Sequence, residues 1–236
     1  MVDSAMVVSA HRLATDIGVQ VLRDGGNAVD AAVAVHWALA VVAPWAGNLG
    51  GGGFMVIRQA DGQVFTLDFR ETAPLAAARD MYTDGSACST ASLVGHKAIG
   101  VPGSVAGLYA LHDSLGRLPM ERLIQPAIEV AEAGFTLTRL DVTELNLRSS
   151  MIRKASTRPS TYTAQETWHT GDTLRSPDLA RTLARIRDKG AEEFYAGHTA
   201  RLIVAEMERG GGLITVMNPY FRPIGAELGH NVTFNY

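Results

Sequence analysis

The chain has 236 residues, of which 47% are hydrophobic and 19% are charged, and its formal net charge is −3 at pH 7. This length allows one sizeable domain or two small ones, and the composition is typical of an ordinary globular enzyme. The small negative charge creates no field that favours nucleic acid or an anionic membrane surface, so neither partner is predicted.

The termini and apolar runs give few signs of targeting. The longest apolar run, over 31–47, is interrupted by a histidine and closed by Pro44, so no membrane span is predicted. The first ten residues carry Asp3 and no basic residue, unlike a signal peptide. We expect a cytoplasmic protein, or a periplasmic or secreted one if a leader has been lost. The single cysteine, Cys88, lies in a small polar run and is expected to be a loop thiol.

Two helices are predicted near the start of the chain. Residues 11–24 form an amphipathic pattern that a Gly-Gly pair ends. Asn27 is expected to cap a second helix over 28–42, with Asp30 completing a weak capping box. That second segment is apolar on almost every side, which indicates a buried helix. His36 lies inside it and is expected to be a hydrogen-bonded core residue.

A hairpin follows. Residues 54–58 and 63–70 predict two strands joined by a tight turn at Asp61-Gly62. Apolar and polar side chains alternate along the second strand and therefore occupy opposite faces. The core-facing set is Phe65, Leu67 and Phe69, and the polar set is Thr66, Asp68 and Arg70.

The rest of the chain is mainly helical in pattern. Helices are expected over 104–116 with Ser104 as N-cap, over 119–133 with Pro126 kinking or dividing it, over 176–190, and as a short and a longer helix within 191–212. Residues 75–100 are expected to be irregular with some helix near 76–82, and 139–170 shows no clear pattern. The carboxylates near 187–194 are expected on solvated helix surfaces. An α+β chain, rich in helix, is therefore predicted.

Four consecutive glycines, Gly50 to Gly53, separate the second helix from the hairpin. A phosphate-binding glycine loop runs from a strand into a helix N-terminus, where amide donors and the helix dipole favour an anion. Here the order is helix, glycines, strand, and no Lys-Ser/Thr pair follows. We expect instead that the glycines let one backbone approach another closely.

Arg70 is the strongest candidate for a binding residue. It lies at a strand end on the polar face, where a guanidinium can hold a carboxylate in a bidentate pair. A structural ion pair with Asp68 or Glu71 is the alternative, which spacing alone favours. The seven histidines show no ligand-like spacing, so no metal site is predicted, and no GxSxG motif is present.

Five motifs occur in order along the chain: DGGNAVDAAVA (24–34), GNLGGGGFMVIR (47–58), DFRETAP (68–74), VPGSVAG (101–107) and GGLIT (211–215). With these motifs the chain closely resembles the N-terminal part of the large subunit of the gamma-glutamyltranspeptidase family. The resemblance covers about residues 6 to 215, and the combination is far more specific than any single glycine run.

The resemblance implies an N-terminal nucleophile hydrolase with an αββα sandwich, made as a precursor that cleaves itself. It implies that the new N-terminal threonine of a small subunit attacks γ-glutamyl amides such as glutathione, with its own α-amine as base. Water or an amino acid or peptide acceptor then resolves the acyl-enzyme. The arginine of the DFRE motif, which matches Arg70, would bind the α-carboxylate, with Glu71 fixing it in place. No cofactor is implied.

This sequence departs from the family at its end. Family members are considerably longer, whereas this chain ends 21 residues after GGLIT, in a segment, 216–236, that does not align. No threonine stands in the cleavage context, so no catalytic residue is assigned. We expect 1–215 to be a partial, truncated large-subunit domain, inactive without the small subunit. A cephalosporin or glutaryl acylase of the same family, or a non-catalytic remnant, is the alternative.

Overall fold

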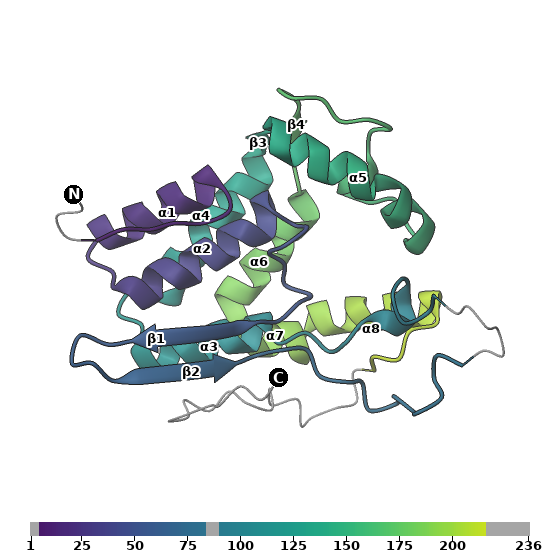
Figure 1. Cartoon of the computed structure of the whole chain (residues 1–236), viewed down its shortest axis with the longest axis horizontal. Coiled ribbons are helices and arrows are strands. Elements are labelled where there is room, and N and C mark those ends of the chain that lie inside the picture. The colour runs from purple at the N-terminus through teal and green to yellow at the C-terminus, as the bar shows by residue number, and fades with distance from the viewer. Residues whose placement is uncertain (1–4, 84–89, 216–236) are drawn as a thin grey trace.

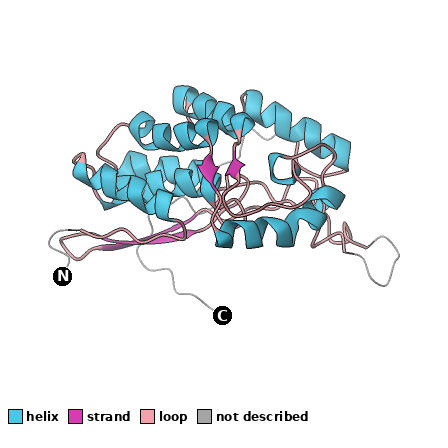
Figure 2. Cartoon of the chain, turned by 90° about the horizontal axis from the view of Figure 1, so that it is seen from above, coloured by secondary structure: helices cyan, strands magenta, loops and turns pink. Residues whose placement is uncertain are grey.

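The computed structural model describes residues 5–83 and 90–215. Most of these residues are helical, and one antiparallel hairpin lies along the edge of the helical layer (Figures 1 and 2). The predicted α+β class is confirmed. Across the two described ranges, no helix combines the length and the apolar character that a membrane span requires. The expected loop thiol, Cys88, lies outside the described residues.

The first two helices match the prediction closely. Helix α1 spans Arg12–Arg23, and α2 spans Ala28–Val42. The Asn27 side chain accepts the amide of Asp30 at 2.9 Å, while the Asp30 carboxylate accepts the amide of Asn27 at 2.8 Å, so the capping box is confirmed. Asp30 is fully buried and also accepts the amide of Arg117 at 2.9 Å. This carboxylate therefore links the start of α2 to the connection between two later helices.

The helical layer is built around α2. Helices α1, α2, α4 (Met120–Ala133) and α6 (Pro177–Lys189) pack against one another in that order. Trp37 of α2 is fully buried, as the apolar pattern predicted for this helix. The sequence predicts that Pro126 kinks or divides this helix; α4 is continuous through Pro126, so the second alternative, division, is wrong. Packing of its apolar stripe compensates for the one hydrogen bond that proline cannot donate.

The hairpin consists of β1 (Phe54–Arg58) and β2 (Val64–Asp68). The turn closes by a 2.9 Å hydrogen bond from the amide of Gln59 to the carbonyl of Gln63, and Gly62 has φ of 90°. Three residues therefore form the loop, with glycine at the left-handed position. The predicted alternation is confirmed over 67–70, because Leu67 and Phe69 are each 2% exposed while Asp68 and Arg70 are exposed. Phe65 and Thr66 are both half-buried, so burial does not separate the two faces there.

Helix α3 (Ser104–Leu115) lies against the inner face of the hairpin. Ser104 is its first helical residue and Gly103 is the N-cap, so the predicted N-cap is wrong. The backbone bonds of 103 and 104 explain the difference: both amides donate to the carbonyl of Gly51, at 2.9 and 3.0 Å. A tertiary acceptor thus replaces the serine side chain at this helix start.

Several elements of the second half were not predicted. Helix α5 (Arg139–Ala155) occupies the unassigned region, and a two-residue sheet pairs β3 (Phe135–Thr136) with β4 (Thr173–Leu174). Short 3-10 helices η1 and η2 span His96–Ala98 and Thr161–Thr163. Helices α7 (Ala191–Tyr195) and α8 (His198–Gly210) form the expected short and longer pair. The helix expected near 76–82 is absent, because these residues form turns.

Candidate functional site

Glycines from two motifs pack against the backbone that carries Arg70. A Cβ at Gly52 would lie 2.5 Å from the carbonyl oxygen of Phe69 and 2.8 Å from the Cα of Arg70. A Cβ at Gly103 would overlap the same carbonyl oxygen. Only glycine fits at either position without a backbone shift. The expectation that the glycine run permits close backbone approach is confirmed.

Backbone hydrogen bonds join the same segments into one unit. The carbonyl of Gly51 accepts the amides of Gly103 and Ser104, as noted above. Thr72 and Val101 form an antiparallel bridge, with N–H to carbonyl distances of 3.1 and 2.8 Å. The segment containing Arg70 is therefore held on one side by the glycine run and on the other by the 101–107 segment.

The Arg70 side chain makes two contacts. Its Nε lies 3.3 Å from Oε2 of Glu71, and its guanidinium carbon lies 5.7 Å from the centre of the Phe54 ring. The Asp68 carboxylate instead accepts the backbone amide of Arg70, at 2.9 Å. The sequence left open a structural ion pair of Arg70 with Asp68 or Glu71, and the structure contains the pair with Glu71. The side chain is nevertheless 62% exposed.

The remaining edge of the guanidinium is open. Within residues 5–83 and 90–215, neither Nη1 nor Nη2 of Arg70 forms a hydrogen bond, and the ion pair with Glu71 has its contact at Nε. Arg70 and Glu71 line a cleft whose other walls come from two loops: Thr72, Ala73, Pro74, Met81, Tyr82, Ala98, Ile99 and Gly100. Two parallel N–H donors on a permanent cation match the two oxygens of a carboxylate. The site can therefore bind a carboxylate while Glu71 remains paired.

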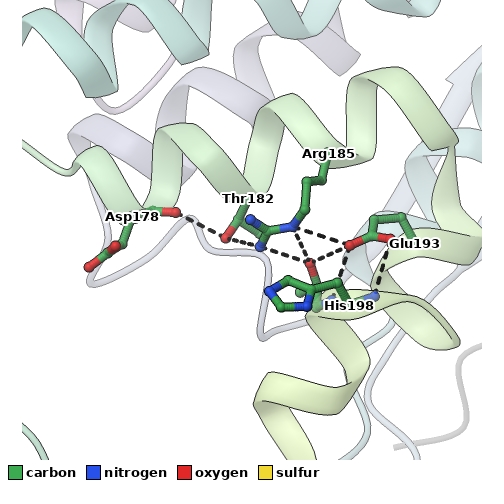
Figure 3. A network of polar contacts seen from close by, with 6 residues as sticks. Asp178, Thr182, Arg185, Glu193 and His198 are labelled. Carbon is green, nitrogen blue, oxygen red and sulfur yellow. Dashed lines mark hydrogen bonds and ion pairs between the residues drawn. The ribbon is translucent and has the colours of Figure 1, made fainter.

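A buried carboxylate joins α6, α7 and α8 (Figure 3). Glu193 is 5% exposed and accepts the backbone amides of Thr199 at 3.1 Å and His198 at 3.2 Å. The Nε of Arg185 also donates to it, at 3.2 Å. Burial acts to raise the pKa of Glu193, but the hydrogen bonds from Thr199 and His198 outweigh it and lower the pKa. The carboxylate thus caps α8 in place of Gly197, which has no side chain.

This buried cluster supports the segment that packs on the Arg70 backbone. Tyr195, two residues after Glu193, donates its hydroxyl to the carbonyl of Pro102 at 2.9 Å and accepts the amide of Ala106 at 3.1 Å. The expectation that carboxylates in 187–194 lie on solvated surfaces is wrong for Glu193. Gly197, the residue before α8, could have indicated the role of Glu193 in the sequence, because a helix start without a side-chain cap needs another acceptor.

His36 of α2 contacts Phe69, the residue before Arg70. Its ring packs edge-to-face on Phe69, with 6.3 Å between centroids. Burial lowers the pKa of His36 from 6.5 to about 4, so the imidazole is neutral at pH 7. The described residues provide no hydrogen-bond partner for its buried Nε2, so the expected hydrogen-bonded role is wrong for that atom. In the described ranges, no group of histidine, cysteine or acidic residues has the geometry of a metal site.

Comparisons with solved structures define the fold class of the protein. The chain superposes on Helicobacter pylori gamma-glutamyltranspeptidase with a TM-score of 0.85 and 40% identity, over 92% of this chain and 63% of that one. It superposes on a cephalosporin acylase from Bacillus halodurans with a TM-score of 0.83 at 23% identity, a likeness of fold alone. The fold is that of the N-terminal nucleophile hydrolases, of which these residues form a helix-rich part.

Sequence comparison gives the family. The family model described as gamma-glutamyltranspeptidase matches residues 14–218. A glutathione hydrolase proenzyme of Pseudomonas sp. (strain A14) is 46% identical over 90% of this chain, and one of Escherichia coli (strain K12) is 44% identical over 89%. This chain belongs to the gamma-glutamyltranspeptidase family. It spans 38% and 37% of the length of these two curated relatives.

Proposed function

We propose that this chain provides part of the donor site of a gamma-glutamyltransferase or glutathione hydrolase, in which Arg70 binds the α-carboxylate of the γ-glutamyl group. The observation that carries the proposal is the guanidinium of Arg70, whose Nη1 and Nη2 form no hydrogen bond with the described residues and which lines an open cleft. The names of the two relatives, glutathione hydrolase proenzyme, support the substrate class.

In this proposal the two edges of the Arg70 guanidinium bind different carboxylates. Glu71 pairs with the Nε edge, which restrains rotation of the guanidinium plane. The two Nη groups then donate in parallel to both oxygens of one carboxylate, a geometry that lysine cannot reproduce. Binding at the α-carboxylate leaves the γ-amide of the substrate extended away from Arg70. The reacting bond is thus oriented by a contact at the opposite end of the glutamyl group.

The chemical step would be performed outside this chain. In the reaction that the resemblance implies, the threonine hydroxyl at the start of a small subunit attacks the γ-carbonyl carbon and its α-amine takes the proton. The amide C–N bond breaks, the amine product leaves, and water or an acceptor amine releases the acyl group. We therefore expect residues 1–236 alone to release no p-nitroaniline from γ-glutamyl-p-nitroanilide. Turnover by the purified chain that Arg70→Gln abolishes would contradict this division of roles.

Three anilides test the binding role. γ-Glutamyl-p-nitroanilide carries an α-carboxylate and an amine, glutaryl-p-nitroanilide carries only the carboxylate, and 4-aminobutanoyl-p-nitroanilide carries only the amine. Dissociation constants from ligand-observed NMR are expected to be at least about tenfold weaker for the compound without a carboxylate, since a charge-assisted hydrogen bond contributes roughly 1.5–3 kcal/mol. Arg70→Gln should abolish this difference.

Two results would count against the proposal. Equal binding of all three anilides would show that no carboxylate is recognised, and unchanged discrimination in Arg70→Gln would place recognition elsewhere. The acylase alternative has only the fold likeness at 23% identity in its favour. An acylase would bind the glutaryl compound more tightly than the γ-glutamyl compound, so the same titrations also separate these two functions.

A further inference from the structure

The outer face of the hairpin brings an aromatic ring to Arg70. Phe54 is directly opposite Asp68 in the register of β1 and β2, and Arg70 follows Asp68 by two residues. Residues two apart in an extended segment share a face, so Phe54 and Arg70 are diagonal neighbours on the outer side. The guanidinium carbon lies 5.7 Å from the ring centre, within the distance at which an aromatic face attracts a cation.

Glu71 alone restrains Arg70 incompletely. It contacts one edge of the guanidinium, through Nε, and the Arg70 side chain is 62% exposed. A long exposed side chain with one ion pair retains much of its rotamer freedom, and exposed pairs contribute little. The Phe54 ring restricts a different direction, because the guanidinium carbon lies over the ring, whereas Glu71 contacts the Nε edge. Together the two contacts restrain one edge and one face and leave the Nη end available.

We propose that Phe54 is a positioning residue for Arg70, holding its guanidinium against the ring so that Nη1 and Nη2 are presented to a substrate carboxylate. This inference rests on the proposed function of Arg70. It assigns a role to the first residue after the glycine run, since the run fixes the backbone beside Arg70 and Phe54 then fixes the side chain. Val56, two residues further along the same face and 69% exposed, is opposite Thr66 in the register and provides a matched comparison.

Arginine reactivity measures this restraint directly. Residues 1–236 are treated with phenylglyoxal, and the modification rate of each arginine is followed by peptide mass spectrometry. Arg58, an exposed arginine at the end of β1, serves as the internal reference. Relative to Arg58, the rate at Arg70 should rise about two- to fivefold in Phe54→Leu, which is the range expected for loss of an exposed cation–π contact.

Three further variants make the result specific. Phe54→Tyr should keep the wild-type rate, Phe54→Trp should lower it because the indole face binds cations best, and Val56→Ala should leave it unchanged. If Phe54→Leu unfolds the hairpin, Arg58 reacts faster as well, and the Trp variant then decides the matter. The positioning role would be overturned if the modification rate of Arg70 were unchanged in all Phe54 variants. It would also be overturned if Val56→Ala changed that rate as much as the Phe54 variants do.

The substrate arm keeps the two proposals apart. γ-Glutamyl-p-nitroanilide should slow modification of Arg70, but not of Arg58, in the wild type and in Phe54→Tyr, and protect less in Phe54→Leu. Absence of protection in the wild type would refute carboxylate binding while the rates without ligand still test Phe54. Equal protection in wild type and Phe54→Leu would leave carboxylate binding intact and refute the role of Phe54 in presenting Arg70.

Discussion

Gly52 and Phe69 are packed so closely that a Cβ at position 52 would lie 2.5 Å from the Phe69 carbonyl oxygen. That oxygen belongs to rigid backbone and cannot swing away as a flexible side chain could. We expect Gly52→Ala to lower the free energy of unfolding by about 1–3 kcal/mol, the range for inserting a methyl group into a packed site. Thermal denaturation followed by circular dichroism measures the change.

The same glycine run contains the control. A Cβ at Gly50 would come no closer than 3.7 Å to any neighbour, the Oδ1 of Asn48. Gly50→Ala should therefore change the free energy of unfolding little, or raise it slightly by restricting the unfolded chain. Equal destabilisation by both alanines would show that the run requires glycine for its flexibility and not for space beside Phe69.

Glu71 should affect binding more than stability. In Glu71→Gln the Nε of Arg70 loses its charged partner, and we expect affinity for γ-glutamyl-p-nitroanilide to weaken about two- to fivefold, with a change in unfolding free energy below about 0.5 kcal/mol. Asp68→Asn is the matched control, because it removes a neighbouring negative charge and keeps an oxygen for the Arg70 amide. Tighter binding in Glu71→Gln but not in Asp68→Asn would mean that Glu71 competes with the substrate instead of orienting Arg70.

The buried carboxylate of Glu193 should make stability depend on acidity. Its pKa is lowered in the folded state by hydrogen bonds that outweigh burial, so its contribution is present above the unfolded pKa of about 4.3 and is lost as pH falls through the folded pKa. We expect Glu193→Gln to cost about 1–3 kcal/mol at pH 7. The melting temperatures of variant and wild type should converge as the pH falls from the unfolded pKa through the lowered folded pKa. Glu192→Gln, at the exposed neighbour, should change neither quantity.

His36 should make stability depend on pH over a different range. Burial lowers its pKa from 6.5 to about 4, so between these values the unfolded chain binds a proton that the folded chain does not. Its stabilising effect is therefore complete above pH 6.5 and declines as pH falls toward 4. We expect His36→Leu to reduce the loss of melting temperature between pH 7 and pH 5. His169→Gln, a change at an exposed histidine, should leave that loss as in the wild type.

Local patterns predicted the elements whose own side chains determine their structure. The capping box at Asn27 and the burial of α2 follow from residues next to one another in sequence. The face of Arg70 follows from alternation along β2. The register of the hairpin does not follow from such local patterns. A two-residue turn at Asp61-Gly62 would place Phe54 opposite Phe69, whereas the observed three-residue loop places it opposite Asp68. One loop residue thus decides whether an aromatic ring lies beside Arg70.

Other features depend on distant partners. Helix α5 has a polar sequence in which only Asp141 and Leu145 are buried, so its apolar stripe is too weak to predict from pattern. The burial of Glu193 arises because α6, α7 and α8 meet around it, and Gly103 replaces Ser104 as N-cap because Gly51 supplies a tertiary acceptor. Such contacts are specified by the packed fold and by no single segment.

We propose that Arg70 holds a substrate carboxylate through a planar pair of donors. The most direct test is the dissociation constant of γ-glutamyl-p-nitroanilide for Arg70→Lys beside the wild type, because lysine keeps the positive charge and loses the bidentate geometry. We expect binding to weaken about tenfold, a difference of roughly 1.4 kcal/mol. A dissociation constant for Arg70→Lys equal to that of the wild type would show that bidentate binding by Arg70 does not contribute.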